Sequence, residues 1–357
     1  MAISQFTPRA MTASVRMMGD GRQNFLTNSV FERGGMHPTE SINFGVMKVL
    51  ARALVYQKLG GPAVPVNKSA ADANSVTAPR LRLKTVMDEG FALILNPALA
   101  SYVGPYTDPQ AQMAEKVAME QRKLRMRVDR AIELQAAEGL STGIVTIPYE
   151  DGSSATVVYG YTGNGVLVGD GYTIQPTLAG TNVWSSVQSK PMDVLEALAS
   201  QIRDGSDYGG AFDVLLGADA WAALMNNDKA MKQLDNRNLN IGQMAPVAAA
   251  LFKGMFNGMQ IFQYSIGYHN VAGARVQAFN SKLAVVVPRQ GTGLLTVEHA
   301  AVFEQATPEA SASFIQTDYF SKTVHHEDPP VDEIIVESRP LALVKDPSAI
   351  RVQQVLA

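Results

Sequence analysis

The stretch Asp108–Gly139, DPQAQMAEKVAMEQRKLRMRVDRAIELQAAEG, guides the interpretation of the whole chain. Asp108 is a suitable N-cap, and Pro109 suits the first helical position because its fixed φ is already helical. Apolar residues recur behind them on one stripe, at spacings of four and seven. They are Met113, Val117, Leu124, Val128 and Ile132. With Gly139 as the expected stop, the pattern predicts a helix of about 30 residues and roughly 45 Å.

The composition indicates a globular protein. The chain has 357 residues, of which 46% are hydrophobic, so it has enough apolar side chains for a substantial core. Its net charge of −3 indicates that the surface as a whole does not attract nucleic acid. The absence of cysteine excludes disulfides and thiolate sites. Because we find no signal peptide and no apolar run long enough for a membrane span, we expect a soluble protein made in the cytoplasm.

Two regions lack the regular apolar spacing that a core of their own would need. Residues 1–40 contain the turn formers GDGRQN and ERGGMHP and predict an extended arm. Residues 41–59 fit either a short helix or two strands. Residues 60–107 are rich in Pro, Ala, Asn and Ser, apart from the alternating piece Leu81–Val86, which predicts a half-exposed strand. Because so long a connection is uncommon in a compact domain, we expect it to be disordered or to pack outside its own chain.

The rest of the chain mixes strands and helices. GIVTIPYEDG and SATVVYGYT predict a hairpin that turns at Asp151–Gly152. The segments PMDVLEALASQIRD and ADAWAALMNN predict helices, with the buried strand AFDVLLG between them. MQIFQYSIGYH, ARVQAFN and LAVVVP predict strands, and DEIIVESRPLALVKDPSAIRVQQVL predicts long strands broken at Pro340 and Pro347. The fold class is therefore α+β.

Two glycine-rich motifs of catalytic type occur in the wrong context. Gly139–Gly143, GLSTG, matches the G-x-S-x-G nucleophile elbow, which requires a strand before it and a helix after it. Here the expected helix precedes and a strand follows, so we interpret the motif as a helix end. Gly163–Gly169, GNGVLVG, resembles a dinucleotide loop, but no helix opens behind it to bind a phosphate.

The stretch His325-His326-Glu327-Asp328 places two imidazoles beside two carboxylates. Adjacent residues point to opposite faces of a strand, so the two histidines are poorly placed to bind one metal. We therefore favour a polar turn before the strand VDEIIVES. A metal or acid–base centre is the alternative.

The expected helix carries five basic residues within QRKLRMRVDR. Three of them have an acidic partner at helical spacing. The expected pairs are Lys123 with Glu120, Arg125 with Asp129, and Arg130 with Glu133. Arg122 and Arg127 have no such partner, so they are candidates for contacts with another subunit or, non-specifically, with DNA phosphates.

Four pieces of the C-terminal half follow one another in a fixed order: DVLLGADAWAALMNNDKAMKQLDNRN, FKGMFNGMQIFQYSIGYHN, KLAVVVPRQGTGLLTVEHA and IIVESRPLALVKDPSAIRVQQVLA. Together with the arm, the extended segment and the long helix, they resemble the lambda-type major capsid protein family of tailed bacteriophages. The resemblance covers the chain from roughly Asn24 to its end, and the order and spacing of the pieces carry it.

The resemblance implies the Hong Kong 97 capsid fold. The implied segments are an N-terminal arm (1–46), an extended loop (47–96), a peripheral domain (97–190) with a spine helix (108–139), an axial domain (191–306) and closing strands returning to the peripheral domain (307–357). The extended loop would reach over a neighbouring subunit. Its candidate contact residues are Lys68, Arg80, Arg82 and Lys84.

The implied function is that of a major capsid protein, with no catalytic, cofactor or metal residues. Hexamers and pentamers of the chain would form an icosahedral shell around double-stranded DNA. No long charged helical segment precedes the arm, so we expect a separate scaffolding protein, with a portal and a decoration protein as further partners. The protein would be assembled in the host cytoplasm and reside in the virion. The alternatives are an encapsulin-type nanocompartment and, from a different class, the metal-dependent enzyme considered above.

Overall fold

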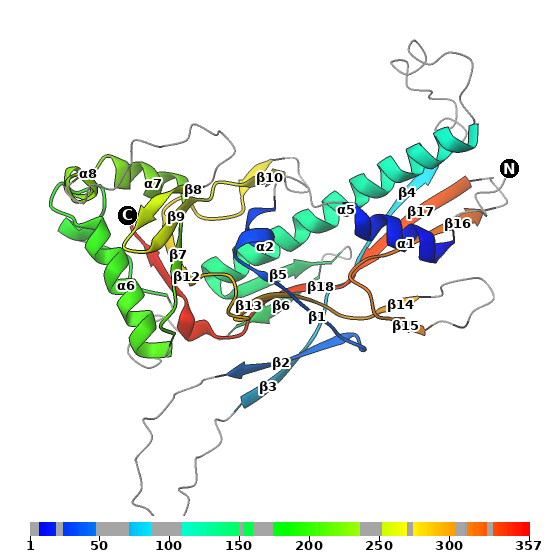
Figure 1. The fold of residues 1–357 in the computed structure, drawn as a ribbon, viewed down its shortest axis with the longest axis horizontal. Coiled ribbons are helices and arrows are strands. Elements are labelled where there is room, and N and C mark those ends of the chain that lie inside the picture. The colour runs from blue at the N-terminus through cyan, green and yellow to red at the C-terminus, as the bar shows by residue number, and fades with distance from the viewer. Residues whose placement is uncertain are drawn as a thin grey trace, which may run out of the picture.

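The structure, a computed structural model, describes residues 7–18, 24–47, 71–87, 109–149, 153–159, 174–206, 208–235, 252–269, 274–304, 311, 313–326 and 331–357. Its helices are α1 (Pro8–Met17), α2 (Phe25–Ser29), α5 (Pro109–Thr142), α6 (Pro191–Ser206), α7 (Ala218–Met225) and α8 (Asp228–Asp235), with 3-10 turns η1 (Gly180–Asn182) and η3 (Pro347–Ala349). Its strands are β1 (Glu32–Met36), β2 (Ser41–Met47), β3 (Ala71–Thr77), β4 (Leu81–Met87), β5 (Ile144–Pro148), β6 (Ser154–Val158), β7 (Phe212–Leu216), β8 (Phe252–Phe256), β9 (Met259–Gln263), β10 (Gly267–His269), β11 (Arg275–Gln277), β12 (Leu283–Pro288), β13 (Leu295–His299), β14 (Val302–Glu304), β15 (Ser313–Ile315), β16 (Phe320–His326), β17 (Val331–Ser338), β18 (Pro340–Val344) and β19 (Arg351–Gln354). The mixture confirms the predicted α+β class (Figure 1).

A five-stranded mixed sheet in the order β19-β12-β7-β9-β8 lies at the centre of one half of the molecule. β7 and β9 run parallel, and the other neighbours are antiparallel. The helices α6, α7 and α8 gather on the side of this sheet that faces away from α5 (Figure 1). The apolar runs predicted as strands β7 and β12 are buried along their whole length.

The central strands β7 and β12 of this sheet are buried on both faces, so they separate two hydrophobic cores. Along β12, Ala284 and Val286 belong to the core under α6, α7 and α8, whereas Val285 and Val287 belong to the core under α5. All four side chains are fully buried. The division follows from strand geometry, because successive side chains point to opposite faces. An apolar run without polar alternation is what a strand between two cores requires.

The long helix α5 has 34 residues and is therefore about 50 Å long. Figure 1 shows it as a diagonal that runs beside β4, β16 and β17. The predicted apolar stripe is buried at Val117, Leu124, Val128 and Ile132, each at most 4% exposed, and the helix packs on β17 and β18. In the described residues, no helix combines the length and the apolar character needed to cross a bilayer.

The predicted end of the long helix was wrong. α5 continues through Gly139 to Thr142 and ends before Gly143, whose φ of 71° is a conformation that side chains disfavour. The Gly143 N–H donates to the carbonyl oxygen of Gly139 at 3.1 Å. Gly139 instead allows close packing, because a Cβ there would lie 3.1 Å from Cε2 of Tyr159.

The prediction of an extended arm was also wrong in part. Residues 8–17 form α1, which packs on β16 and α5 and buries Met11 and Val15. Thr7 caps this helix by accepting a hydrogen bond from the Ala10 N–H, and Pro8 follows the cap. A helix of 10 residues offers few repeats of the apolar period, which is why the sequence pattern missed it.

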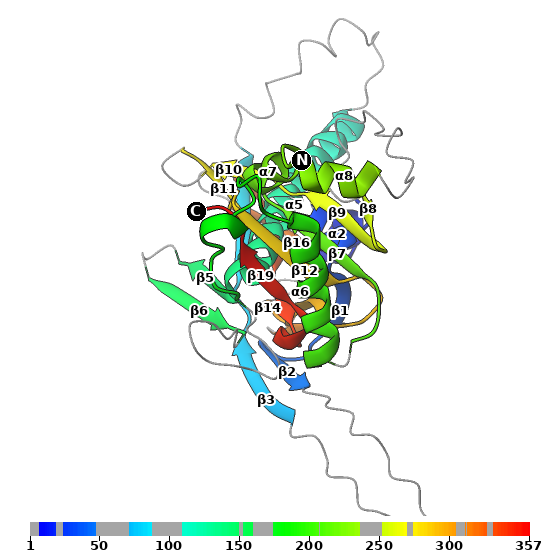
Figure 2. The ribbon, with the colours of Figure 1, turned by 90° about the vertical axis from the view of Figure 1, so that its left-hand side faces the viewer.

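The strands β2 and β3 form a two-stranded ribbon that pairs with no other described strand. The ladder runs from Ser41↔Thr77 to Met47↔Ala71. Figures 1 and 2 show the ribbon extending away from the body of the molecule. β2 confirms the strand alternative for residues 41–47, whereas residues 48–59 lie outside the described part. β4, the predicted half-exposed strand, returns to the body and joins a sheet in the order β16-β17-β4.

The last strand differs from the expected arrangement of the closing segment. β17 and β18 pack against α5, as expected for a return to the peripheral part. β19 instead pairs with β12 at the edge of the five-stranded sheet. η3 makes the crossing, and Asp346 fixes it by accepting a hydrogen bond from the Ser348 N–H at 2.9 Å. The described part of 307–357 therefore contributes to both halves.

Replacing Gly143 by alanine should lower the free energy of unfolding by about 1 kcal/mol, because a Cβ disfavours a positive φ. Urea unfolding of the purified subunit, followed by circular dichroism, measures the change. Gly35→Ala is the matched control, because Gly35 lacks a positive φ and a Cβ there meets no atom within 4 Å. Equal unfolding midpoints for the two variants would contradict the assignment of Gly143 as the helix terminator.

Candidate functional site

The base of the predicted extended loop is fastened to a closing strand by a buried ion pair. β4 and β17 are paired, with Arg82 opposite Glu337. Just before β4, Arg80 donates twice to Glu337, from Nε to Oε1 at 2.5 Å and from Nη2 to Oε2 at 2.8 Å. The Glu337 side chain is fully buried, so this bidentate contact compensates a charge that would otherwise be costly to bury. The hydrogen bond to Glu337 is the main cause that raises the pKa of Arg80.

A second carboxylate joins this pair to two further cations. Glu304 on β14 accepts from Lys322 on β16 at 2.9 Å and lies 3.0 Å from Nη2 of Arg82. Arg80 reaches the same carboxylate at 3.5 Å. We call these five residues the loop-base cluster: Arg80, Arg82, Glu304, Lys322 and Glu337. Three cations thus share two carboxylates from strands distant in sequence, which fixes the place where the loop leaves the body.

Of the four residues predicted to contact a neighbouring subunit, three lie at this base and one lies outside the described residues. Lys68 is the one outside. Arg80 and Arg82 are bound to carboxylates of their own chain, and Lys84 donates to Glu333 at 2.8 Å. The cations still expose 39%, 41% and 61% of their side chains, respectively. Their contact with another subunit stays a prediction.

The two histidines of the predicted polar turn lie at the end of β16. Nδ1 of His325 is 2.7 Å from Oδ1 of Asp332, and Nε2 of His326 is 3.6 Å from Oε2 of Glu333, both across the β16-β17 hairpin. The hydrogen bond from Lys84 is the main reason that the pKa of the Glu333 carboxyl lies below its ordinary value. Glu327 and Asp328 lie outside the described residues. Within the described part, no three His, Cys, Asp or Glu side chains are grouped so as to hold a metal ion.

The arm is anchored to α5 by a buried arginine. Nη1 of Arg125 donates to the carbonyl oxygens of Val15 at 2.5 Å, Arg16 at 3.2 Å and Met18. These carbonyls are at the C-terminal end of α1, where they have no partner within the helix. The Arg125 guanidinium also lies 4.8 Å from the ring centre of Tyr319. A cation at this end of α1 stabilises the helix dipole as well as the carbonyls.

About two turns further along α5, Glu133 plays the opposite role for α2. Its Oε1 and Oε2 accept hydrogen bonds from the N–H groups of Leu26 and Thr27 at 2.9 and 3.0 Å, and Tyr264 donates its hydroxyl at 3.0 Å. Asn24, the N-cap of α2, makes no such bond with its own side chain. Burial raises the pKa of Glu133, although the three donors oppose the rise.

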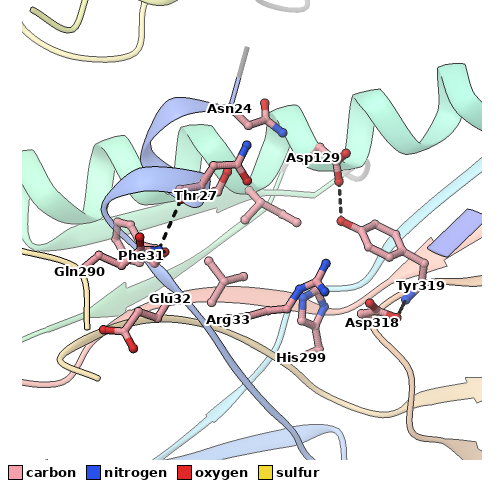
Figure 3. Close-up of a pocket in the computed structure, with 13 residues that line it drawn as sticks. Asn24, Thr27, Phe31, Glu32, Arg33, Asp129, Gln290, His299, Asp318 and Tyr319 are labelled. Carbon is pink, nitrogen blue, oxygen red and sulfur yellow. Dashed lines mark hydrogen bonds between the residues drawn. The ribbon is translucent and has the colours of Figure 1, made fainter. Parts of the chain in front are cut away.

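A polar cavity of about 310 Å³ lies between the arm, α5 and the strand β13 (Figure 3). Its walls include Glu32 and Arg33 from β1, Asp129 from α5, and His299 and Tyr319 (Figure 3). The Tyr319 hydroxyl donates to Asp129 Oδ1. Burial raises the pKa of Tyr319 above its ordinary value, and Asp129 adds to the rise. The hydroxyl of Tyr319 therefore stays protonated near neutral pH.

The cavity also contains His299, whose pKa is lowered into the acidic range. The side chain is buried, and burial lowers its pKa from 6.5 to about 4, with the charge of Arg33 acting in the same direction. Asp318 opposes the shift. Ser338 Oγ lies 3.4 Å from Nδ1 and donates to the carbonyl oxygen of Asp318. The imidazole of His299 is therefore neutral, and it lies where the arm meets the closing strands.

Two of the three predicted ion pairs along α5 are confirmed and one is wrong. Lys123 pairs with Glu120 at 2.6 Å, and Arg125 lies 3.5 Å from Asp129. Arg130 does not pair with Glu133, because that carboxylate caps α2. Its Nη2 donates to the carbonyl oxygen of Gly267 instead.

Arg122 and Arg127 are exposed, and neither forms an ion pair with a described residue. Arg127 lines a groove together with Arg130 and Arg275. The structure therefore separates the two predicted residues: Arg127 belongs to a cluster, whereas Arg122 does not line that groove.

The serine of the G-x-S-x-G motif lies in the last turn of α5. Its Oγ donates to the carbonyl oxygen of Glu138 at 3.3 Å. The helix precedes the motif and β5 follows it, so the elbow geometry does not form. Gly163–Gly169 lies outside the described residues.

The sequence did not indicate which residues hold the arm, α2 and the loop base on the body of the molecule through polar contacts. Glu304, Lys322, Glu337 and Arg275 were not singled out, and Arg125, Arg130 and Glu133 were expected only in ion pairs along the helix. One signal was available: Glu337 stands in the apolar run IIVESRPLALV, and a charge inside a buried strand requires a partner. The identity of that partner depends on tertiary pairing and is not visible in the local pattern.

Comparisons with known proteins identify relatives of the whole chain. The sequence model of the family described as phage major capsid protein E matches residues 7–354. A solved structure described as the capsid protein of a prophage of E. coli CFT073 has a TM-score of 0.65 at 15% identity, with 99% of each chain covered. A phage-related protein of Bordetella bronchiseptica RB50 has a TM-score of 0.54 at 9% identity, with 98% of this chain and 97% of the other covered. The capsid of a native GTA particle has a TM-score of 0.53 at 12% identity, with 95% and 92% covered. No curated protein sequence matches.

Arg80→Ala should lower the free energy of unfolding by about 2 kcal/mol, because it leaves the buried carboxylate of Glu337 without its main partner. Lys84→Ala is the matched control. It removes an exposed cation from the same strand region, so we expect a loss of at most about 1 kcal/mol. Urea unfolding of both subunits measures the difference. A loss for Arg80→Ala no larger than that for the control would contradict the structural role of the pair.

The buried His299 should make the subunit sensitive to acid. Its folded pKa lies below its ordinary value, so the folded state binds fewer protons and stability falls as the pH drops from about 6.5 towards 4. Over that window the loss attributable to His299 is about 3 kcal/mol. Urea unfolding between pH 7 and 4.5 should show a shallower decline for His299→Asn than for the wild type. Parallel declines would mean that other groups cause the acid sensitivity.

Proposed function

Because the chain belongs to the phage major capsid protein E family, we propose that its copies assemble as hexamers and pentamers into an icosahedral shell around double-stranded DNA. The chain is a structural protein of a phage or prophage capsid and not an enzyme. Its fold is of the Hong Kong 97 type, which confirms the fold and the family that the sequence resembled. The assembly described in the following paragraphs is the proposal.

The observation that carries the proposal is the β2-β3 ribbon. It pairs with no other described strand, and beyond its base, where Ile42 is buried in the core under α5, it extends away from the body of the molecule (Figures 1 and 2). A two-stranded ribbon is only marginally stable in water, so it requires a surface beyond its own chain. A neighbouring copy supplies that surface at every position of a closed ring. Within the predicted extended loop of residues 47–96, β4 pairs with β17 of its own chain, and the part beyond the ribbon, with Lys68, would lie over that neighbour.

The loop-base cluster supports the same arrangement. A loop that binds another subunit needs a fixed position relative to its own subunit. Here the base of the loop is fixed by the bidentate contact of Arg80 with buried Glu337. The side chains of Arg82 and Lys84 are partly exposed, so they can also contact a second chain. We propose that these three side chains combine an internal role with the predicted intersubunit one.

The remaining parts of the proposal concern partners and location. A separate scaffolding protein would direct closure of the shell in the host cytoplasm, a portal would occupy one vertex, and a decoration protein would bind the outside. The peripheral domain (97–190) and the axial domain (191–306) would form the tiles of the shell. The exposed cations Arg122 and Arg127 would face the packaged DNA or a neighbouring subunit.

Replacing residues 48–70 by a short Gly-Ser turn should leave a folded subunit that forms no closed shells. The strands β2, β3 and β4 and the loop-base cluster stay intact in this variant, so its thermal unfolding should match that of the wild type. A second variant carries a Gly-Ser linker of the original length. It preserves the reach of the loop and removes its side chains, so we expect it to fail as well.

Electron microscopy after size-exclusion chromatography, with the scaffolding protein present, measures closure. Wild-type shells alongside absent shells for both variants would support the loop assignment. Normal shells from both variants would overturn it. Wild-type shells that enclose an enzyme in place of DNA would favour the nanocompartment alternative.

A further inference from the structure

A groove between α5 and the β10-β11 hairpin gathers three arginines. Arg127 and Arg130 lie one turn apart on α5, and Arg275 comes from β11 on the opposite wall. Ala131 and Leu134 line the groove between them, and Gly267 and Tyr268 complete the wall from β10. We call Arg127, Arg130 and Arg275 the groove arginines. They are 148 residues apart at most in sequence, so only the fold brings them together.

The groove arginines have no carboxylate partner in the described part of the chain. Glu133 has the right helical spacing from Arg130, but its two oxygens already accept the N–H groups of Leu26 and Thr27. Three guanidinium charges in one groove repel one another, and each is more stable beside an anion. In the loop-base cluster, by contrast, each cation lies within ion-pair distance of a carboxylate. The groove therefore favours an anion from outside the chain.

The backbone of β10 holds two of these side chains in place. Arg130 donates through Nη2 to the carbonyl oxygen of Gly267, whereas its Nη1 is buried and has no hydrogen-bond partner among the described residues. A Cβ at Gly267 would lie 2.9 Å from Nε of Arg275, so the glycine lets Arg275 lie against the strand. A buried donor without an acceptor is unfavourable. Because Nη1 is shielded from solvent, the guanidinium must rotate before an oxyanion in the groove can accept from it.

We propose that the groove arginines bind a phosphate oxyanion, and that its source in the assembled shell is a phosphodiester of the enclosed duplex DNA. The guanidinium fork matches the geometry of phosphate oxygens, which explains three arginines where lysines would serve as point charges. The contact is to the backbone, so it is independent of base sequence. The DNA source rests on the proposed function. The site adds Arg130 and Arg275 to the predicted Arg127 and leaves Arg122 outside.

Fluorescence anisotropy of a labelled 20-base-pair duplex, titrated with the purified full-length subunit, tests the site. In Arg127→Gln/Arg275→Gln, binding should weaken roughly tenfold, and the slope of log K against log salt should fall by about 1, the value for one phosphate contact. Arg9→Gln/Lys232→Gln is the matched control. It removes two exposed positive charges from α1 and α8, so net charge changes equally, and binding should change less than twofold.

Gly267→Ala tests the geometry without changing any charge. The new Cβ displaces Arg275, a flexible side chain, and Gly267 has no positive φ that alanine would strain. Binding of the duplex should weaken about threefold while thermal unfolding is unchanged. Retained binding in both Gly267→Ala and Arg127→Gln/Arg275→Gln would overturn the site.

Two further arms identify the source of the phosphate. In the first arm, inorganic phosphate competes with the duplex. If millimolar phosphate displaces the duplex from the wild type and does not bind the groove variants, the site accepts free phosphate as well as DNA. Shell assembly by electron microscopy is scored separately. Normal shells with weakened duplex binding in the groove variants support the proposal. Lost shells with unchanged duplex binding would overturn it and assign the groove to a carboxylate of a neighbouring subunit. Absence of wild-type shells tests the proposed function alone, because anisotropy still reports on the groove.

Discussion

The central strands β7 and β12 of the five-stranded sheet have no face towards solvent, and this constraint joins the two halves of the molecule. Along β12, Ala284 and Val286 fill one core while Val285 and Val287 fill the other. A shift of one residue would exchange the two sets, but every position is apolar, so the pairing with β7 and β19 must fix the register. The chain first forms β17 and β18, which pack against α5. Only then does it form β19, which pairs with β12 at the edge of the five-stranded sheet. The end of the chain therefore locks the placement of one half against the other.

Segments without a core of their own are fastened to this body by buried charges. Arg125 holds the end of α1 across 110 residues of sequence, Glu133 holds α2 across 107, and Glu337 holds the base of the loop across 257. Hydrogen bonds to a buried charge are directional, and breaking one leaves that charge uncompensated. A small number of such contacts can thus position a segment whose apolar area is too small to do so. The β2-β3 ribbon is anchored at its base by Ile42 and pairs with no other described strand, so its outer part is available for contacts beyond the chain.

The sequence pattern predicted those elements in which one period extends over many residues. The stripe from Val117 to Ile132 and the unbroken apolar runs of β7 and β12 belong to this class. α1 was missed because ten residues give little periodicity, and the end of α5 because Gly143 rather than Gly139 has the positive φ. The pair Arg130–Glu133 has the spacing that stabilises an isolated helix. Burial decided otherwise, because a buried carboxylate needs several donors and α2 offers free N–H groups. Such competition between local spacing and tertiary partners cannot be read from one sequence.

The same competition explains where positive charge is left on the surface. The loop-base cations are bound by carboxylates of their own chain, whereas Arg127 and Arg130 on α5 and Arg275 on the neighbouring β11 lie together without a carboxylate partner among the described residues. The chain as a whole carries a net charge of −3, so the rest of its surface is negative on balance. A local positive patch on a negative protein attracts a polyanion to one side and repels it from the others. A shell that encloses DNA needs that asymmetry, because a uniformly basic subunit would bind nucleic acid on both surfaces and before closure.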